Sequence, residues 1–179
     1  MTGPADGDIA CRGPRSGDHL SVAAWCFPGV AKHVAGARRW ARAVAGAWGA
    51  PGAEVGLVVS ELVTNALRHT RSGCPGGTVT VAIAGGWDGV TVHVHDLGAE
   101  SGRVPRPRPA AGGGLADGGR GLPIVMAVGA EWGIILAVRC PVWGPGDPAA
   151  EAGGCCTWCY LPSQPPGQAG EEGAVLWTS

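Results

Sequence analysis

The stretch VVSELVTNALRHT (residues 58–70) carries side chains that could do chemistry at every fourth position, namely Glu61, Asn65 and His69. At about 100° per residue, Glu61 and Asn65 fall on one arc of a helix, and apolar side chains fill the opposite arc. A carboxylate and an amide oxygen one turn apart can contact the same bound ligand. Both are hard oxygen ligands that suit Mg²⁺ and its waters. From these residues alone, a solvated helix face remains the alternative.

A second stretch, VHVHDLG (residues 92–98), ends a predicted strand at Asp96, with Gly98 two residues further on. A carboxylate just past a strand can accept a hydrogen bond from an exocyclic amine. The glycine would let a ligand or the backbone approach closely. An ordinary turn has the same pattern.

A third stretch, GGGLADGGRGLPIV (residues 112–125), places Gly118, Gly119 and Gly121 before a helix predicted to open at Leu122. Free backbone amides at a helix start, within a glycine loop, form a site for phosphates. Flexible linkers have a similar composition, so this reading also has an alternative.

Hydrophobic periodicity predicts the elements that position these stretches. The expected strands are residues 19–27, 78–84, 89–96, 131–139 and 155–162, with a loop at 140–154. Helices are expected after Pro28, over residues 53–70 and from Leu122. In the first of these, the residues at helical spacing are Val30, Val34, Ala37, Ala41, Val44 and Trp48. Helices segregated from an antiparallel sheet predict an α+β two-layer sandwich.

Length and composition predict one domain with tails. The chain has 179 residues, of which 33 are Gly and 15 are Pro. Much of this excess falls in residues 1–18, in 98–121 and after 161, which are typical of mobile segments. We therefore expect a disordered N-terminus at 1–18, a folded domain at 19–162 and a disordered tail at 163–179.

Charge and hydropathy exclude several function classes. The net charge of −1 gives no electrostatic case for binding nucleic acid, for which a basic face would be expected. No apolar stretch reaches the roughly 18–20 residues that span a bilayer, and the start of the chain lacks the pattern of a signal peptide. The seven Cys are odd in number and scattered, which disfavours a disulfide framework. These features predict a cytoplasmic protein.

Two groups of possible metal ligands have simpler interpretations. His93 and His95 lie on the same face of a strand, yet no third and fourth ligand stands at a recognisable spacing. We interpret them as part of an exposed sheet face. Strand alternation separates Cys156 from Cys155 and Cys159, so we expect buried thiols that pack as small hydrophobes. Five tryptophans are expected to serve the core: Trp25, Trp40, Trp48, Trp132 and Trp158.

The order of these motifs resembles the GHKL ATPase superfamily. Its closest likeness is to the small stand-alone anti-sigma-factor serine kinases. SELVTNALRH looks like their N-box, VHDLG like the first glycine box and GRGLPIV like the second, while EWG and CTWCYLP also fit the pattern. The likeness covers roughly residues 25–162. It implies a Bergerat-type sandwich with a mixed, largely antiparallel sheet and helices on one face.

The resemblance also implies residue roles. Asn65 would coordinate Mg²⁺, Glu61 would act as general base, and Asp96, with Gly98 beside it, would accept from the adenine amino group. The segment 99–118 would be the ATP lid. The residues that would surround the phosphates at the second box are Gly119, Arg120, Gly121 and Leu122.

The function implied is that of an ATP-binding regulator. It would phosphorylate a Ser or Thr on an antagonist protein and sequester a sigma factor or a related target. Relatives of this kind often pair as homodimers, although the sequence does not fix the oligomeric state. One departure weakens kinase activity: DLGAES (residues 96–101) lacks the second glycine that the first box often carries. The alternative is a non-catalytic module that binds ATP or ADP as a structural ligand. An ATPase working in a larger complex is a third interpretation.

Overall fold

Five strands form one antiparallel sheet in the order β1-β2-β3-β5-β4. The structure is a computed structural model that describes residues 21–86, 88–99, 125, 127–129, 131–137 and 148–163. The strands are β1 (Ser21–Pro28), β2 (Thr78–Gly85), β3 (Gly89–Asp96), β4 (Glu131–Leu136) and β5 (Cys155–Pro162). All four described pairings are antiparallel.

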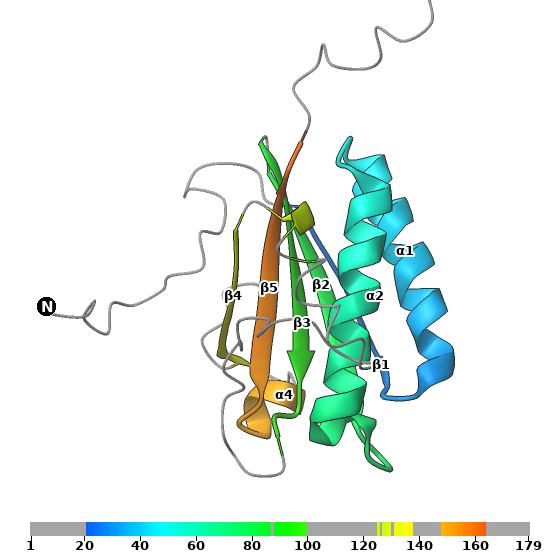
Figure 1. Cartoon of the computed structure of the whole chain (residues 1–179), viewed down its shortest axis with the longest axis vertical. Helices are drawn as coiled ribbons and strands as arrows, with labels where there is room; N and C mark the ends of the chain where they lie inside the picture. The colour runs from blue at the N-terminus through cyan, green and yellow to red at the C-terminus, as the bar shows by residue number, and fades with distance from the viewer. Residues whose placement is uncertain are drawn as a thin grey trace, which may run out of the picture.

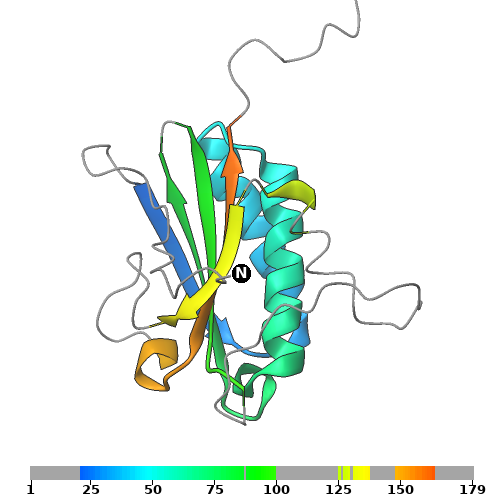
Figure 2. The ribbon, with the colours of Figure 1, turned by 60° about the vertical axis from the view of Figure 1, so that its left-hand side comes forward.

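Two helices pack together on one face of this sheet (Figure 1). They are α1 (Val34–Ala47) and α2 (Gly52–His69). Figure 2 shows the same two layers from a second side. Short helical segments complete the described fold: η1 (Ala31–His33), η2 (Arg71–Gly73) and α4 (Pro148–Glu151). The predicted α+β two-layer sandwich, with helices on one face of the sheet, is confirmed.

The main core lies between the sheet and the two helices. In α1 the small residues Ala37, Ala41 and Ala45 recur every four positions and are fully buried, so α2 can approach α1 closely. From the sheet, the alternate valines of β2 and β3 point into this core. Trp25, Trp40, Trp48 and Trp132 pack against its margin, as predicted.

The face of the sheet away from the helices is also buried over its central strands. Thr80, Ala82 and Ala84 of β2 are almost fully buried, and His93 and His95 of β3 are 0% exposed. The expectation that the two histidines mark an exposed sheet face is therefore wrong. Trp158 is buried on this second face, within a cluster formed with Cys156.

Three local differences from the predicted elements have physical causes. Val30 is extended and 46% exposed, and does not belong to the helix face, because the Gly29 N–H donates to the Gly77 carbonyl and holds the chain extended there. The expected loop 140–154 contains the short helix α4. The strand predicted to run to residue 139 ends at Leu136, and the Ala137 N–H donates instead to the Gly154 carbonyl.

The third helix is described only at Val125, Ala127 and Val128, which are helical as expected. Val125 is fully buried and belongs to the main core. Within the described residues, no helix has the length and apolar character needed to cross a membrane. The predicted disordered N-terminus at 1–18 lies outside the described residues, and so does the predicted tail at 163–179 except for Ser163, whose N–H donates to the Asp88 carbonyl.

Candidate nucleotide-binding site

Helix α2 places Glu61 and Asn65 beside each other at its border between buried and exposed faces. Its buried side includes Leu62 and Ala66, whereas Glu61 and Asn65 are half-buried. The hydroxyl of Thr64 donates to the Ser60 carbonyl over 2.7 Å, so it is satisfied within the helix. Among the described residues, neither Glu61 nor Asn65 has a side-chain hydrogen bond or ion pair.

Asp96 ends β3 as a buried carboxylate, only 6% exposed. Its Oδ1 accepts a hydrogen bond from the Gly98 N–H over 2.7 Å. Gly98 has φ +76°, in the left-handed region that side chains other than glycine rarely adopt. The turn thus requires the glycine of the Asp-x-Gly sequence, and its N–H holds the Asp96 carboxylate in place.

Burial raises the pKa of the Asp96 carboxyl from 3.8 to about 6. The Gly98 N–H, His95, Arg71 and the backbone of Cys155 oppose this shift by favouring the charged form. A buried carboxylate held at an energetic cost is typical of a binding site, where a ligand supplies the missing donor. The buried Asp96 carboxyl is thus consistent with the expected acceptor of a hydrogen bond from an exocyclic amine.

Arg71 and Ser72 join the end of α2 to the loop after β3. The Arg71 N–H donates to the Gly98 carbonyl over 2.8 Å. The Arg71 guanidinium donates to the carbonyls of Leu97 and Ala152, the latter over 2.8 Å. The Leu97 N–H donates to the Ser72 hydroxyl over 2.9 Å. Asn65 lies four residues before the end of α2, about 6 Å along the helix axis, so these bonds hold the two expected ligand-binding stretches at one end of the domain.

The start of β5 also contacts this loop closely. A Cβ atom on Gly154 would lie 1.9 Å from the Asp96 carbonyl oxygen, so only glycine fits there. The Gly154 N–H donates to the Ala149 carbonyl over 2.7 Å, which connects α4 to the same region. Sequence reasoning missed Arg71, Ser72 and Gly154. Only the position of Arg71 and Ser72 just after the helix could have drawn attention to the first two.

The sequence matches the family described as the histidine kinase-like ATPase domain over residues 27–131. The chain belongs to this family. The matched segment includes α2, β3 and the loop after β3, where the hydrogen bonds above bring the candidate residues together. No curated protein matches the chain. The family match confirms the superfamily expected from the motifs. ATP is the ligand expected for a histidine kinase-like ATPase domain.

Part of the expected site falls outside the described residues. This applies to Gly119, Arg120, Gly121 and Leu122, and to the lid segment beyond residue 99. All four second-box residues lie within the matched segment 27–131. Their roles, like those of Glu61, Asn65, Asp96 and Gly98, remain predictions.

The described residues fit Mg-ATP in their chemistry. Asn65 and Glu61 offer hard oxygen ligands, and Asp96 offers a buried acceptor beside a close backbone approach at Gly98. These groups come from α2 and from the end of β3, and the contacts of Arg71 tie the two elements together. This donor set suits a purine with an attached polyphosphate and its cation.

Proposed function

We propose that this histidine kinase-like ATPase domain is a cytoplasmic ATP-binding regulator of the anti-sigma-factor type. In this proposal it transfers phosphate from ATP to a Ser or Thr of an antagonist protein and sequesters a sigma factor or a related target. The observation that supports it best is the joining of the Glu61–Asn65 helix to the Asp96–Gly98 loop by Arg71. That link joins the two elements whose side chains would serve as the adenine acceptor and as the oxygen ligands of the cation.

Each residue has a separate task in this mechanism. Asp96 accepts a hydrogen bond from the adenine amino group and selects adenine over bases that lack a donor there. Asn65 would hold Mg²⁺, which neutralises phosphate charge when bound. Glu61, one turn earlier on α2, accepts the proton of the attacking hydroxyl. Glu61 is half-buried, and the proposal requires that its carboxylate be reached by the hydroxyl of a protein substrate.

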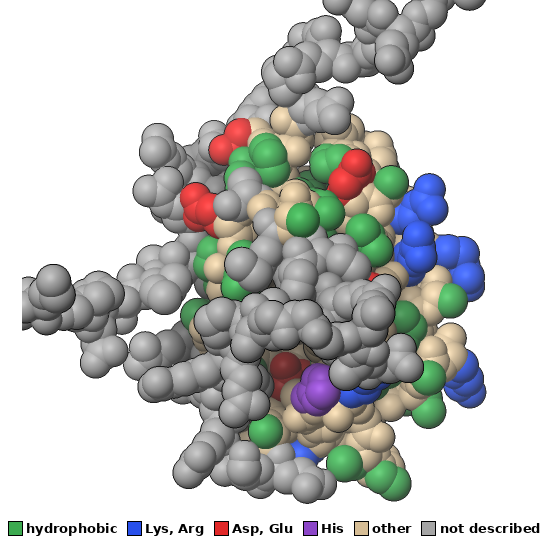
Figure 3. Space-filling view, in the orientation of Figure 1, with side chains coloured by type: hydrophobic (Ala, Val, Ile, Leu, Met, Phe, Trp, Pro, Cys, Tyr) green, Lys and Arg blue, Asp and Glu red, His purple; other side chains and the backbone are tan. Residues whose placement is uncertain are grey.

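The described surface also offers a face for a protein partner. Figure 3 shows Lys and Arg side chains gathered over α1, on the side away from the sheet. Arg38, Arg39 and Arg42 of α1 and Lys32 of η1 are all exposed. A basic face of this kind suits an acidic surface on the target protein.

The alternative is a domain that binds nucleotide without transferring phosphate. The missing second glycine in DLGAES favours it. Both proposals require nucleotide binding, whereas only the first requires a general base at Glu61. The two are therefore separated by phosphotransfer and not by affinity.

Calorimetric titration of ATP and ADP, with and without Mg²⁺, tests the shared requirement. We expect the wild type to bind ATP more tightly with Mg²⁺, and Asn65→Ala to lose this Mg²⁺ dependence. Ser60→Ala is the control, because Ser60 is also half-buried on α2 and its hydroxyl only donates to the Gly56 carbonyl. If the wild type binds neither nucleotide, both proposals are wrong.

A further inference from the structure

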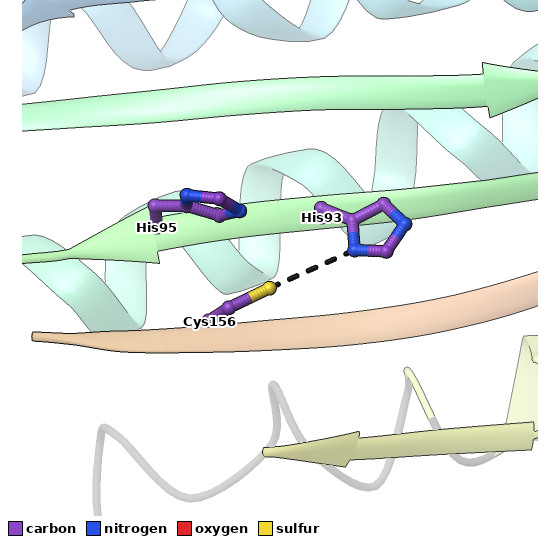
Figure 4. A group of neighbouring side chains, drawn as sticks. All are labelled: His93, His95 and Cys156. Atoms are coloured by element: carbon purple, nitrogen blue, oxygen red, sulfur yellow. Dashed lines mark hydrogen bonds between the residues drawn. The ribbon is translucent and has the colours of Figure 1, made fainter. Parts of the chain in front are cut away.

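Nitrogen and sulfur ligands gather on the face of the sheet away from α1 and α2. His93 and His95 alternate along β3 with Val92 and Val94, which point into the main core. Cys156 of β5 stands opposite His95 in the strand register. Figure 4 shows the two imidazole rings and the thiol on the same side of these strands. All three side chains are 0% exposed.

The spacing of these side chains suits a metal ion. The His93 Nδ1 and the Cys156 Sγ lie 3.6 Å apart, and the ligand atoms of all three residues lie within 4.8 Å of one another. Metal–nitrogen and metal–sulfur bonds of about 2.0 and 2.3 Å place tetrahedral ligands roughly 3.3–3.6 Å apart. The His93–Cys156 pair already meets this separation. Small side-chain rotations would bring His95 into it.

We propose that His93, His95 and Cys156 form a binding site for a thiophilic metal ion, Zn²⁺ or Cu⁺. Two imidazoles and one thiolate are a borderline-to-soft donor set, which suits these ions and not Mg²⁺. The site is therefore separate from the proposed Mg-ATP site. It lies on the opposite face of the sheet and has the opposite ligand preference.

Neighbouring side chains shield the cluster of His93, His95 and Cys156 from solvent. Trp158 stands opposite His93 in the register and is 3% exposed. Its indole covers Gly133 of β4, where a Cβ atom would lie 2.9 Å from the Trp158 Nε1. Ile135 packs against the cluster of Cys156 and Trp158. A metal ion whose protein ligands have no contact with solvent exchanges slowly. The ion would therefore enter during folding and stay bound during purification.

Binding would join two strands next to the nucleotide site. The histidines come from β3 and the cysteine from β5, whose pairing ends at Asp96 and Cys155. A metal held by both strands would fix the end of β3 that carries Asp96. The metal would also raise the thermal stability of the domain, because the three ligands come together only in the folded chain and the metal therefore binds the folded state preferentially.

The test is the metal content of the full chain, measured by mass spectrometry as isolated and after refolding with Zn²⁺ or with Cu⁺ under reducing conditions. We expect about one ion per chain with at least one of these metals. The melting temperature should rise by about 5 °C or more on loading. A chain that retains neither metal would overturn the proposal.

Cys156→Ser and Cys159→Ser are a matched pair of variants. Both thiols are 0% exposed and belong to β5, but Cys159 points into the main core on the other face. A serine at 156 can still hydrogen-bond to His93, so a purely structural pair would tolerate the change. We expect Cys156→Ser to lose the metal and Cys159→Ser to keep it. Equal retention in both variants would contradict the assignment.

A measurement on the wild type alone guards against variants that fail to fold. X-ray absorption of the Zn²⁺- or Cu⁺-loaded chain should show one sulfur neighbour at about 2.3 Å and two imidazole nitrogens at about 2.0 Å. Co²⁺ loading should give a thiolate-to-metal charge-transfer band. A first shell of oxygen atoms, or one with two or more sulfurs, would place the ion elsewhere and overturn the proposal.

Discussion

The backbone N–H of Arg71 donates to the carbonyl of Gly98 over 2.8 Å, which ties the segment after α2 to the loop after β3. The side chain of Arg71 reinforces this link through the carbonyls of Leu97 and Ala152. A single residue thus connects three segments that are distant in sequence. The position of the expected adenine acceptor relative to the expected metal ligand depends on it.

Arg71→Ala should weaken ATP binding by about tenfold while the domain stays folded, because the loop after β3 loses its charged hydrogen bond at Leu97 and the segment before β5 loses the one at Ala152. Arg68→Ala is the control: Arg68 is also exposed and lies three residues earlier, in the last turn of α2. Calorimetry measures the affinity and circular dichroism the fold. Equal affinities in the two variants would show that the link does not position the site.

Glu61→Gln separates the two proposed functions. The amide keeps the shape of the side chain but cannot accept the proton of an attacking hydroxyl. We expect ATP affinity within about threefold of the wild type and a loss of phosphotransfer of about 100-fold or more. Glu54→Gln, in the exposed first turn of α2, serves as the control. The assay is phosphate incorporation into a candidate antagonist protein, and unchanged transfer would exclude Glu61 as the base.

Leu62→Asp should unfold the domain, because Leu62 is 3% exposed in the main core. Burying an unpaired carboxylate costs about 3–5 kcal/mol or more, which is comparable to the whole stability of many domains. Asn65→Ala, three residues later, should leave the domain folded. Urea denaturation followed by circular dichroism compares the two variants. A folded Leu62→Asp chain would mean that the buried side of α2 has been assigned wrongly.

Asp96→Asn should stabilise the ligand-free domain at pH 7.5 but not at pH 4. The pKa of Asp96 is raised from 3.8 to about 6 by burial, so folding favours the protonated form. The stability that this group contributes is present below pH 4 and is lost as the pH rises through 6, by up to about 3 kcal/mol. Asparagine never ionises and escapes this loss.

Urea denaturation at both pH values, with a chelator present, measures the difference between wild type and Asp96→Asn. The side chains of His95 and Arg71, which lower the pKa of Asp96 against the effect of burial, are both unchanged in the variant. A stability difference that is the same at pH 4 and pH 7.5 would show that ionisation of Asp96 is not its cause.

Thiol labelling should divide the described cysteines into two classes. Cys26 and Cys74 are exposed, whereas Cys155, Cys156 and Cys159 are buried. Burial raises the pKa of Cys159 to about 12 and that of Cys155 to about 11, so almost no reactive thiolate forms at pH 8. We expect fast alkylation of Cys26 and Cys74 and slow alkylation of the other three, read site by site by mass spectrometry. Rapid labelling of Cys159 in the folded chain would contradict its placement in the core.

The sequence by itself determined the elements and their order. The apolar spacing of α2 and the alternation of β2 and β3 reflect local geometry that repeats every 3.6 or 2 residues, so they could be read directly. The Glu-x-x-x-Asn spacing and the Asp-x-Gly turn are local as well. For this reason Glu61, Asn65, Asp96 and Gly98 could be chosen as candidates without coordinates.

Only the tertiary structure decided which distant residues meet. The contact of Arg71 with Leu97 and Gly98 depends on how α2 packs against β3, and the meeting of His95 with Cys156 depends on the register between β3 and β5. Strand alternation correctly placed His93 and His95 on one face, but it could not tell that this face is buried. Burial and strand register arise from contacts between segments far apart in the chain, and no local pattern in the sequence records them.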